Sequence, residues 1–289
     1  MINRRSFIKN VTATGIVSSI PSALFSGNGS APSIKLLIRG DDMGKNYGRT
    51  LGFFKSFKEG ILTSASIMAT SVYFDESVKF CNENPKLAPG VHTVIIDGTQ
   101  RPVLSPREVP SLVDPRGFFW DTNEQFEAAN PKIDEIDKEI RAQVEKAKAY
   151  GLKFVYLDNH RGGAGVDEII ISICKEQKLI YGRDYEGERY GYKRVSLIKG
   201  ERFPNQELPD GGRAYYAAPA LTYEEKQLFF DSLEALKPGK WITVVHPGMA
   251  DPNRASTTEL LCSPKTKEIV QKKNIQLVSF RDLWNEEFG

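Results

Sequence analysis

Short apolar runs alternate with amphipathic segments along this chain, and the two patterns predict different elements. A short apolar run is typical of a buried strand, whereas apolar positions repeated at spacings of three and four indicate a helix. Apolar runs predict strands at about residues 34–38, 65–69, 90–95, 153–157, 195–198, 241–245 and 275–280. Strands that alternate with helices are the signature of βαβ units and a parallel sheet. We therefore expect an α/β fold.

Three segments carry the helical pattern most clearly, at about residues 132–150, 166–178 and 222–236. Each repeats apolar residues on one face, which is the face expected to pack on the sheet. The third segment opens with Thr222 followed three residues later by Glu225, a capping box. These faces belong to the core and carry no chemistry.

Two stretches fit neither pattern. Residues 97–122 contain four prolines and two glycines, a composition that predicts a long loop beside the strand ends. Phe118 and Trp120 in this loop could stack on a ligand ring or pin the loop to the core. Residues 182–220 hold several tyrosines among glycines and charges. We expect both stretches to line one cleft.

The N-terminus has the pattern of an export signal. Residues 4–9 read Arg-Arg-Ser-Phe-Ile-Lys and precede a weakly apolar stretch, which resembles a twin-arginine signal. The alternative, a basic amphipathic helix, is disfavoured because a proline and a Gly/Ser-rich linker interrupt it. We expect residues 1–30 to be signal and linker, residues 31–289 to form one domain, and the mature protein to be periplasmic or otherwise exported.

Composition limits the class of protein. With 289 residues, 40% of them hydrophobic, the chain can bury one large core, and a β/α barrel of about this length is normally one domain. Its 39 basic and 37 acidic residues are dispersed and leave a net charge of +2, so a nucleic-acid partner is not expected. Beyond the signal, no apolar run approaches the length of a membrane span, and we expect no stable membrane insertion.

The cysteines carry little information about location. Cys81, Cys174 and Cys262 are widely spaced and form no Cys-x-x-Cys pair. At most two of them could join in a disulfide, and we expect each to be a small buried residue.

Histidines and paired carboxylates stand at the ends of predicted strands. His92, His160 and His246 are the three histidines of the sequence, and each follows an apolar run; Asp41 and Asp42 follow the first run. The C-terminal ends of parallel strands face one shared crevice. One such histidine alone is more often a structural residue, and the paired aspartates alone could cap a helix. The joint pattern favours a shared site.

Carboxylates and imidazoles at one crevice suit metal-dependent hydrolysis. Adjacent aspartates point to opposite faces of a strand, but a turn at its end, eased by Gly40 and Gly44, lets both reach the crevice. One carboxylate can then bind a divalent ion while the other takes a proton from water. Two imidazoles and one carboxylate suit zinc and tolerate other divalent metals. We expect one divalent ion, and zinc and magnesium both stay open.

The order and spacing of four motifs resemble the YdjC-like carbohydrate deacetylases. The motifs are Asp41-Asp42-Met43-Gly44, Gly90-Val91-His92, Asp158-Asn159-His160 and His246-Pro247-Gly248. The resemblance covers roughly residues 33–285. It implies a deformed (β/α) barrel with a largely parallel sheet.

The resemblance also implies a reaction and the residues that perform it. The reaction is removal of an N-acetyl group from a small amino-sugar oligosaccharide or glycoconjugate. Asp42, His92 and His160 match the metal ligands of the family, Asp41 its general base, and His246 the group that protonates the leaving amine.

The chain departs from the family pattern at two arginines. The family commonly continues with further histidines after the position of His160, whereas here Arg161 opens a glycine-rich loop. Arg39 beside the aspartates is also unexpected, and a pair with Asp41 would lower the pKa of that carboxyl. Both arginines could bind an acidic sugar or a phosphate or sulfate group, or could form structural ion pairs.

Three functions stay open. The first is the N-deacetylase, and the second is an O-deacetylase or another amidase on the same metal site, because fold and metal do not choose the acyl group. The third is a catalytically silent carbohydrate-binding protein, for which the changed sequence after His160 is the only hint. The oligomeric state, including a homodimer, also stays open.

Overall fold

A curled parallel sheet forms the centre of the structure, a computed structural model that describes residues 34–163, 165–183, 189–202, 205–207, 213–215 and 218–289. Its strands are β1 (Ile34–Met43), β2 (Ser64–Ile67), β3 (Ala88–Thr93), β4 (Tyr156–Asn159), β5 (Ile180–Tyr181), β6 (Tyr192–Arg194), β9 (Gly239–Val245) and β10 (Ile275–Val278). They run in the order β5-β4-β3-β2-β1-β9-β6, and β10 pairs with the first half of β1. Two further strands, β7 (Asn205–Glu207) and β8 (Arg213–Tyr215), form a separate antiparallel pair.

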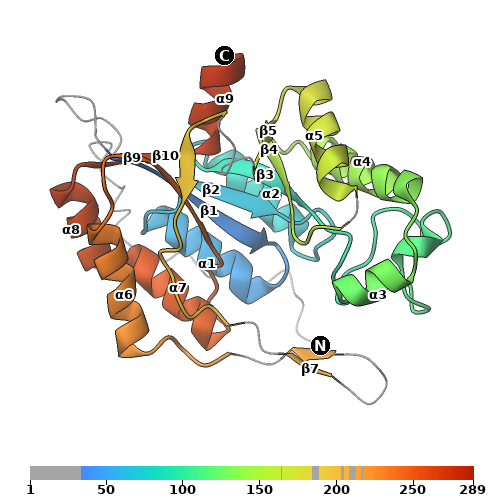
Figure 1. The fold of residues 1–289 in the computed structure, drawn as a ribbon, viewed down its shortest axis with the longest axis horizontal. Helices are drawn as coiled ribbons and strands as arrows, with labels where there is room; N and C mark the ends of the chain where they lie inside the picture. The colour runs from blue at the N-terminus through green and yellow to red at the C-terminus, as the bar shows by residue number, and fades with distance from the viewer. Residues whose placement is uncertain (1–33, 164, 184–188, 203–204, 208–212, 216–217) are drawn as a thin grey trace, which may run out of the picture.

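Helices surround the curled sheet (Figure 1). They are α1 (Tyr47–Lys58), α2 (Phe74–Glu83), α3 (Asn123–Ala128), α4 (Ile133–Ala149), α5 (Val166–Gln177), α6 (Tyr223–Glu234), α7 (Pro252–Cys262), α8 (Pro264–Lys272) and α9 (Phe280–Phe288). Helices α4 and α5 pack together at the β4–β5 edge, while α6, α7 and α8 form a second group with α1 against α7. The half-barrel confirms the predicted α/β class, a deformed (β/α) barrel in a single domain. The predicted signal over residues 1–30 and its boundary lie outside the described residues.

The three predicted helices are present as α4, α5 and α6, each within two residues of its expected bounds. Thr222 and Glu225 form the predicted capping box, since each side chain accepts a hydrogen bond from the other residue's backbone N–H, at 3.2 and 2.8 Å. Six of the predicted strands correspond to β1, β2, β3, β4, β9 and β10.

One predicted strand is wrong. The apolar run at 195–198 lies after β6, which ends at Arg194. Val195 makes a last backbone hydrogen bond to Ile242 of β9, at 2.9 Å, and the chain then leaves the sheet. Leu197 and Ile198 are buried in the core but belong to no strand. The apolar run therefore indicates burial and does not indicate a strand.

Residues 97–122 form the predicted long loop, interrupted by a single 3-10 turn at Pro110–Leu112. Two buried carboxylates of α4 hold its backbone. Glu139 accepts hydrogen bonds from the N–H groups of Val103 and Leu104, at 2.9 and 3.0 Å. Glu135 accepts from the N–H and hydroxyl of Ser111, both at 2.8 Å. The loop is therefore fixed to the helix before β4.

Inside the curl, the layer nearer the N-terminal ends of the strands is apolar. Alternate residues of each strand face inward, and Leu37 of β1, Tyr156 of β4 and Phe280 of α9 belong to one buried cluster. The rings of Tyr156 and Phe280 stack with centroids 4.0 Å apart. A Cβ on Gly90 would lie 2.4 Å from the Tyr156 ring, so only glycine leaves room for it there. Helix α9 thus closes the half-barrel at the end where the strands begin.

The next inward positions along the same strands are charged. Arg39 and Asp41 lie two and four residues after Leu37, and Asp158 lies two residues after Tyr156. His92 of β3 pairs in register with Asp158 of β4. The pleat therefore stacks a polar layer directly above the apolar one.

The cysteines are free thiols, with Cys81 and Cys174 buried and Cys262 half-buried. None of the helices in the described ranges has the length and apolar character that a membrane span needs.

Replacing Glu139 with alanine should destabilise the fold, because two backbone N–H groups of the loop lose a buried carboxyl acceptor. We expect a loss of about 2 kcal/mol in the free energy of unfolding, measured by urea denaturation. Glu145→Ala is the matched control, because that residue is exposed on the same helix and pairs only with Lys148 at the surface. Equal effects of the two substitutions would contradict the anchoring role.

Candidate functional site

The two aspartates of β1 occupy a β-bulge. Gly40 pairs with Ala65 and Met43 with Ile67, so Asp41 and Asp42 together lie opposite one residue of β2. Asp42 has a φ of 76°, a left-handed conformation that costs a non-glycine residue on the order of 1 kcal/mol. A bulge re-aims side chains next to a site. It allows two successive carboxylates each to come close to His92.

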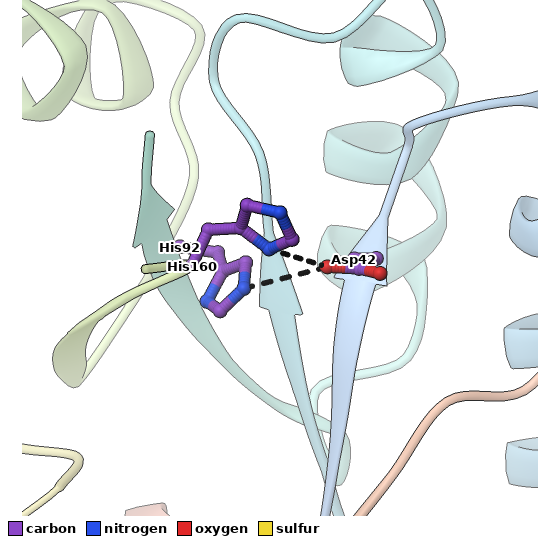
Figure 2. Close-up of side chains that lie close together, drawn as sticks. All are labelled: Asp42, His92 and His160. Carbon is purple, nitrogen blue, oxygen red and sulfur yellow. Dashed lines mark ion pairs between the residues drawn. The ribbon is translucent and has the colours of Figure 1, made fainter. Parts of the chain in front are cut away.

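Asp42, His92 and His160 come together at the C-terminal ends of β1, β3 and β4 (Figure 2). Asp42 Oδ1 lies 3.0 Å from His160 Nδ1 and 3.5 Å from His92 Nε2. This oxygen is buried and has no partner in hydrogen-bond geometry. A buried carboxylate oxygen without such a partner, facing two imidazole nitrogens, offers the donor set that divalent transition metals prefer. The residues present therefore fit a divalent ion.

A second carboxylate lies near each imidazole, within hydrogen-bond distance for His92 only. The Nδ1 atom of His92 lies 2.9 Å from Asp158 Oδ1, which leaves Nε2 for the side of Asp42. A carboxylate behind a histidine is the usual support of a metal ligand. The Nε2 atom of His160 lies 3.8 Å from Asp97 Oδ2, and Lys45 pairs with the same oxygen at 2.6 Å.

The pKa shifts of Asp42 and His160 agree with a cation site, whereas the pKa shift of His92 opposes one. Burial alone would raise the pKa of Asp42, but His160 and Arg49 hold it well below its usual range. Burial lowers the pKa of His160 despite the neighbouring carboxylate. Burial would also lower the pKa of His92, but Asp158 and Asp41 raise it to about 10. Asp42 is thus an anion and His160 a neutral imidazole at pH 7, whereas a metal ion would have to displace a proton from His92.

Arg39 lies in a buried ion-pair network. Its Nε and Nη2 atoms donate to the two oxygens of Asp41 at 2.7 and 2.9 Å, and its Nη1 atom lies 3.0 Å from Asp158 Oδ2. Nη1 also donates to the carbonyl of Gly182 at 2.7 Å. With 1% of its surface exposed, Arg39 follows the structural ion-pair alternative and is not placed to contact a substrate.

One expectation about this pair is wrong. Arg39 does act to lower the pKa of Asp41, but burial outweighs it and the pKa of Asp41 is raised. The sequence reveals the pair through its spacing but does not reveal that the carboxyl is buried.

His246 follows β9 and lies outside the Asp42 cluster. The register of β1 and β9 pairs Gly40 with Val245, so His246 comes level with Asp41. Arg254 of α7 connects the two parts of the site, because it donates to the backbone oxygen of His246 at 3.3 Å and approaches Asp42 Oδ2 at 3.9 Å. His246 also contacts Glu201, a residue that belongs to none of the sequence motifs.

The remaining predicted residues lie in the loops that follow β3 and β4. Arg161 is half-buried and donates to the backbone oxygen of Asp121. Phe118 lies under the Arg101 guanidinium, 4.2 Å from the ring centroid. Trp120 packs on the core and donates through Nε1 to the backbone oxygen of Ser111 at 3.1 Å. Substrate contact by Arg161, Phe118 and Trp120 stays a prediction.

Comparison with known proteins identifies the family. The model of the family described as YdjC-like protein matches residues 35–272. The chain belongs to the YdjC-like protein family.

Relatives of this YdjC-like protein include a protein named carbohydrate deacetylase from Brevibacillus brevis, which is 26% identical over 270 residues that cover 86% of this chain and all of that protein. A carbohydrate deacetylase from Oceanobacillus iheyensis is 32% identical over 146 residues, covering 50% of this chain and 62% of that protein. A crystal structure from Enterococcus faecalis, described as a cellobiose-phosphate cleavage protein, shares the fold with a TM-score of 0.68 at 23% identity, covering 86% and 98% of the two chains.

Replacing Arg39 with methionine should destabilise the protein strongly, because Asp41 and Asp158 lose their buried counter-ion. We expect a loss of about 3 to 5 kcal/mol in the free energy of unfolding. Arg116→Met is the control, because Arg116 is 63% exposed in its pair with Asp114 and should contribute less than about 1 kcal/mol. Urea denaturation of the two variants measures the difference, and similar small losses would show that the network does not support the fold.

Proposed function

We propose that this YdjC-like protein is a divalent-metal-dependent carbohydrate deacetylase that removes N-acetyl groups from a small amino-sugar oligosaccharide or glycoconjugate. The observation that carries the proposal is the buried oxygen of Asp42 facing one nitrogen each of His92 and His160. The names of the relatives support the reaction class.

Asp42, His92 and His160 would hold the ion, and zinc suits this donor set best, with magnesium as the alternative. When bound, a divalent ion supplies Lewis acidity, which lowers the pKa of a coordinated water and polarises the amide carbonyl. The chain's own contribution is to hold the three donors in one place. The bulge at Asp42 and the carboxylate of Asp158 behind His92 provide that geometry.

Asp41 would take the proton of the attacking water. It lies next to Asp42 in the bulge, and Arg39 fixes both of its oxygens. Burial raises the pKa of Asp41, which makes its carboxylate a stronger base than an exposed one. The pairing with Arg39 supplies the positive charge that an ionised carboxyl needs in this buried position.

His246 would give a proton to the leaving nitrogen. Amide hydrolysis needs that proton because an amide anion is a poor leaving group, and an imidazole is the usual donor near neutral pH. His246 directly follows β9, whereas the ligand histidines lie on β3 and directly after β4. Acid and base therefore approach from different strands.

The proposal also covers substrate contact and location. Arg161, Phe118 and Trp120 on the surrounding loops are proposed to contact the sugar, the aromatic rings by stacking. The twin-arginine-like residues 4–9 support export to the periplasm.

Metal content and acetate release test the proposal together. Mature wild-type protein should hold about one divalent ion per chain and release acetate from N-acetylated sugars, and a chelator should stop the release. His92→Ala should lose both the ion and the activity. His246→Ala should keep the ion and lose activity by about 10²-fold or more. A wild-type protein that binds no ion, or whose activity a chelator leaves unchanged, would contradict the mechanism.

The same assay with matched N-acetylated and O-acetylated sugars separates the remaining functions. Release from the N-acetylated sugars supports the proposal, and release from the O-acetylated sugars alone would replace it with an esterase. Sugar binding by the metal-loaded protein without any acetate release would identify a binding protein.

A further inference from the structure

One carboxylate holds both the ring and the backbone of His246. Glu201 Oε2 lies 2.8 Å from His246 Nδ1, and Glu201 Oε1 accepts from the His246 backbone N–H at 3.1 Å. The two residues are 45 positions apart in the sequence, and Glu201 belongs to none of the four motifs. Two contacts from one side chain leave the imidazole little freedom to rotate.

Helix α7 holds Glu201 itself in place. Asn253, which is fully buried, donates to the carbonyl of Gly200 at 3.1 Å and accepts from the N–H of Arg202 at 3.2 Å. Thr257, one turn further along α7, donates its hydroxyl to Glu201 Oε1 at 3.2 Å. The backbone on both sides of Glu201 and one of its oxygens are therefore fixed independently of His246.

Among the residues that the structure describes, the charged groups that act on Glu201 are Arg254 on α7, Asp42 on β1 and Arg49 on α1. Burial raises the pKa of Glu201 to about 7, although Arg254 acts in the opposite direction.

We propose that Glu201 is a positioning residue for His246, which selects the ring tautomer with hydrogen on Nδ1 and stabilises the imidazolium that donates from Nε2. This inference rests on the proposed function for the reaction step. When the C–N bond breaks, its electron pair stays on the nitrogen, which takes the Nε2 proton. His246 leaves the step as a neutral imidazole and regains a proton from water.

The test uses the full mature protein loaded with zinc, as wild type, Glu201→Gln and Glu201→Asp. Glu259→Gln is the matched control, because Glu259 lies on α7 and is 65% exposed. Titration of His246 by ¹⁵N NMR is simple to assign, because the chain has three histidines and the other two are the proposed ligands. Circular dichroism verifies that each variant is folded.

In Glu201→Gln the titration midpoint of His246 should fall by about one pH unit or more, because the imidazolium loses its anionic partner. kcat should fall by about 10- to 100-fold, part of what a general acid supplies, with KM little changed. The basic limb of the kcat profile should move to lower pH with the NMR midpoint. Glu201→Asp keeps the charge on a shorter side chain and should lie between wild type and Glu201→Gln in both readouts.

Failure of this inference is distinguishable from failure of the proposed function. An unchanged midpoint in Glu201→Gln would overturn it and leave Glu201 as a tie between a loop and β9. If wild type releases no acetate, the NMR titration still decides: a lower midpoint supports the positioning role, and an unchanged one overturns it. If Glu201→Gln does not fold, a midpoint and kcat equal to wild type in Glu201→Asp would overturn it.

Discussion

Three carboxylates, those of Asp41, Asp42 and Asp158, are buried at the open end of the curled sheet, and their charges must be balanced there. Arg39 balances Asp41 and Asp158 through contacts of 2.7 to 3.0 Å. Asp42 has Arg49 at 2.7 Å and Arg254 at 3.9 Å from one oxygen, and among the described residues the two ligand histidines lie near the other. Removing the partner of a buried charge strongly destabilises the folded state. The charge layout thus leaves Asp42 Oδ1 as the position for a further cation.

Strand alternation connects this charge layer to the fold. The inward positions of β1 are Leu37, Arg39 and Asp41, so the ion pairs lie directly on an apolar layer. Helix α9 packs against this apolar layer at the end where the strands begin. Gly90, two residues before His92, has no side chain and therefore leaves room for the ring of Tyr156 from the next strand. The packing that stabilises the half-barrel therefore also fixes where the histidines lie along the strands.

The fold class and the approach of Asp42, His92 and His160 could be predicted because strand ends are local features. His92, His160 and His246 each follow an apolar run, and the parallel sheet brings such ends together. Glu201 could not be predicted, because it lies in the irregular stretch at 182–220 and its place depends on Asn253, fifty-two residues later. The sign of the pKa shift of Asp41 was missed because it depends on burial, which spacing alone does not reveal.

The most direct test of the account is the position of a metal ion in crystals of the mature protein grown with zinc. The account predicts one anomalous-scattering peak at the zinc edge, about 2.0 to 2.2 Å from Asp42 Oδ1 and from one nitrogen each of His92 and His160. A peak between Asp41 and Asp158, or no peak beside Asp42 while these side chains keep their places, would contradict it.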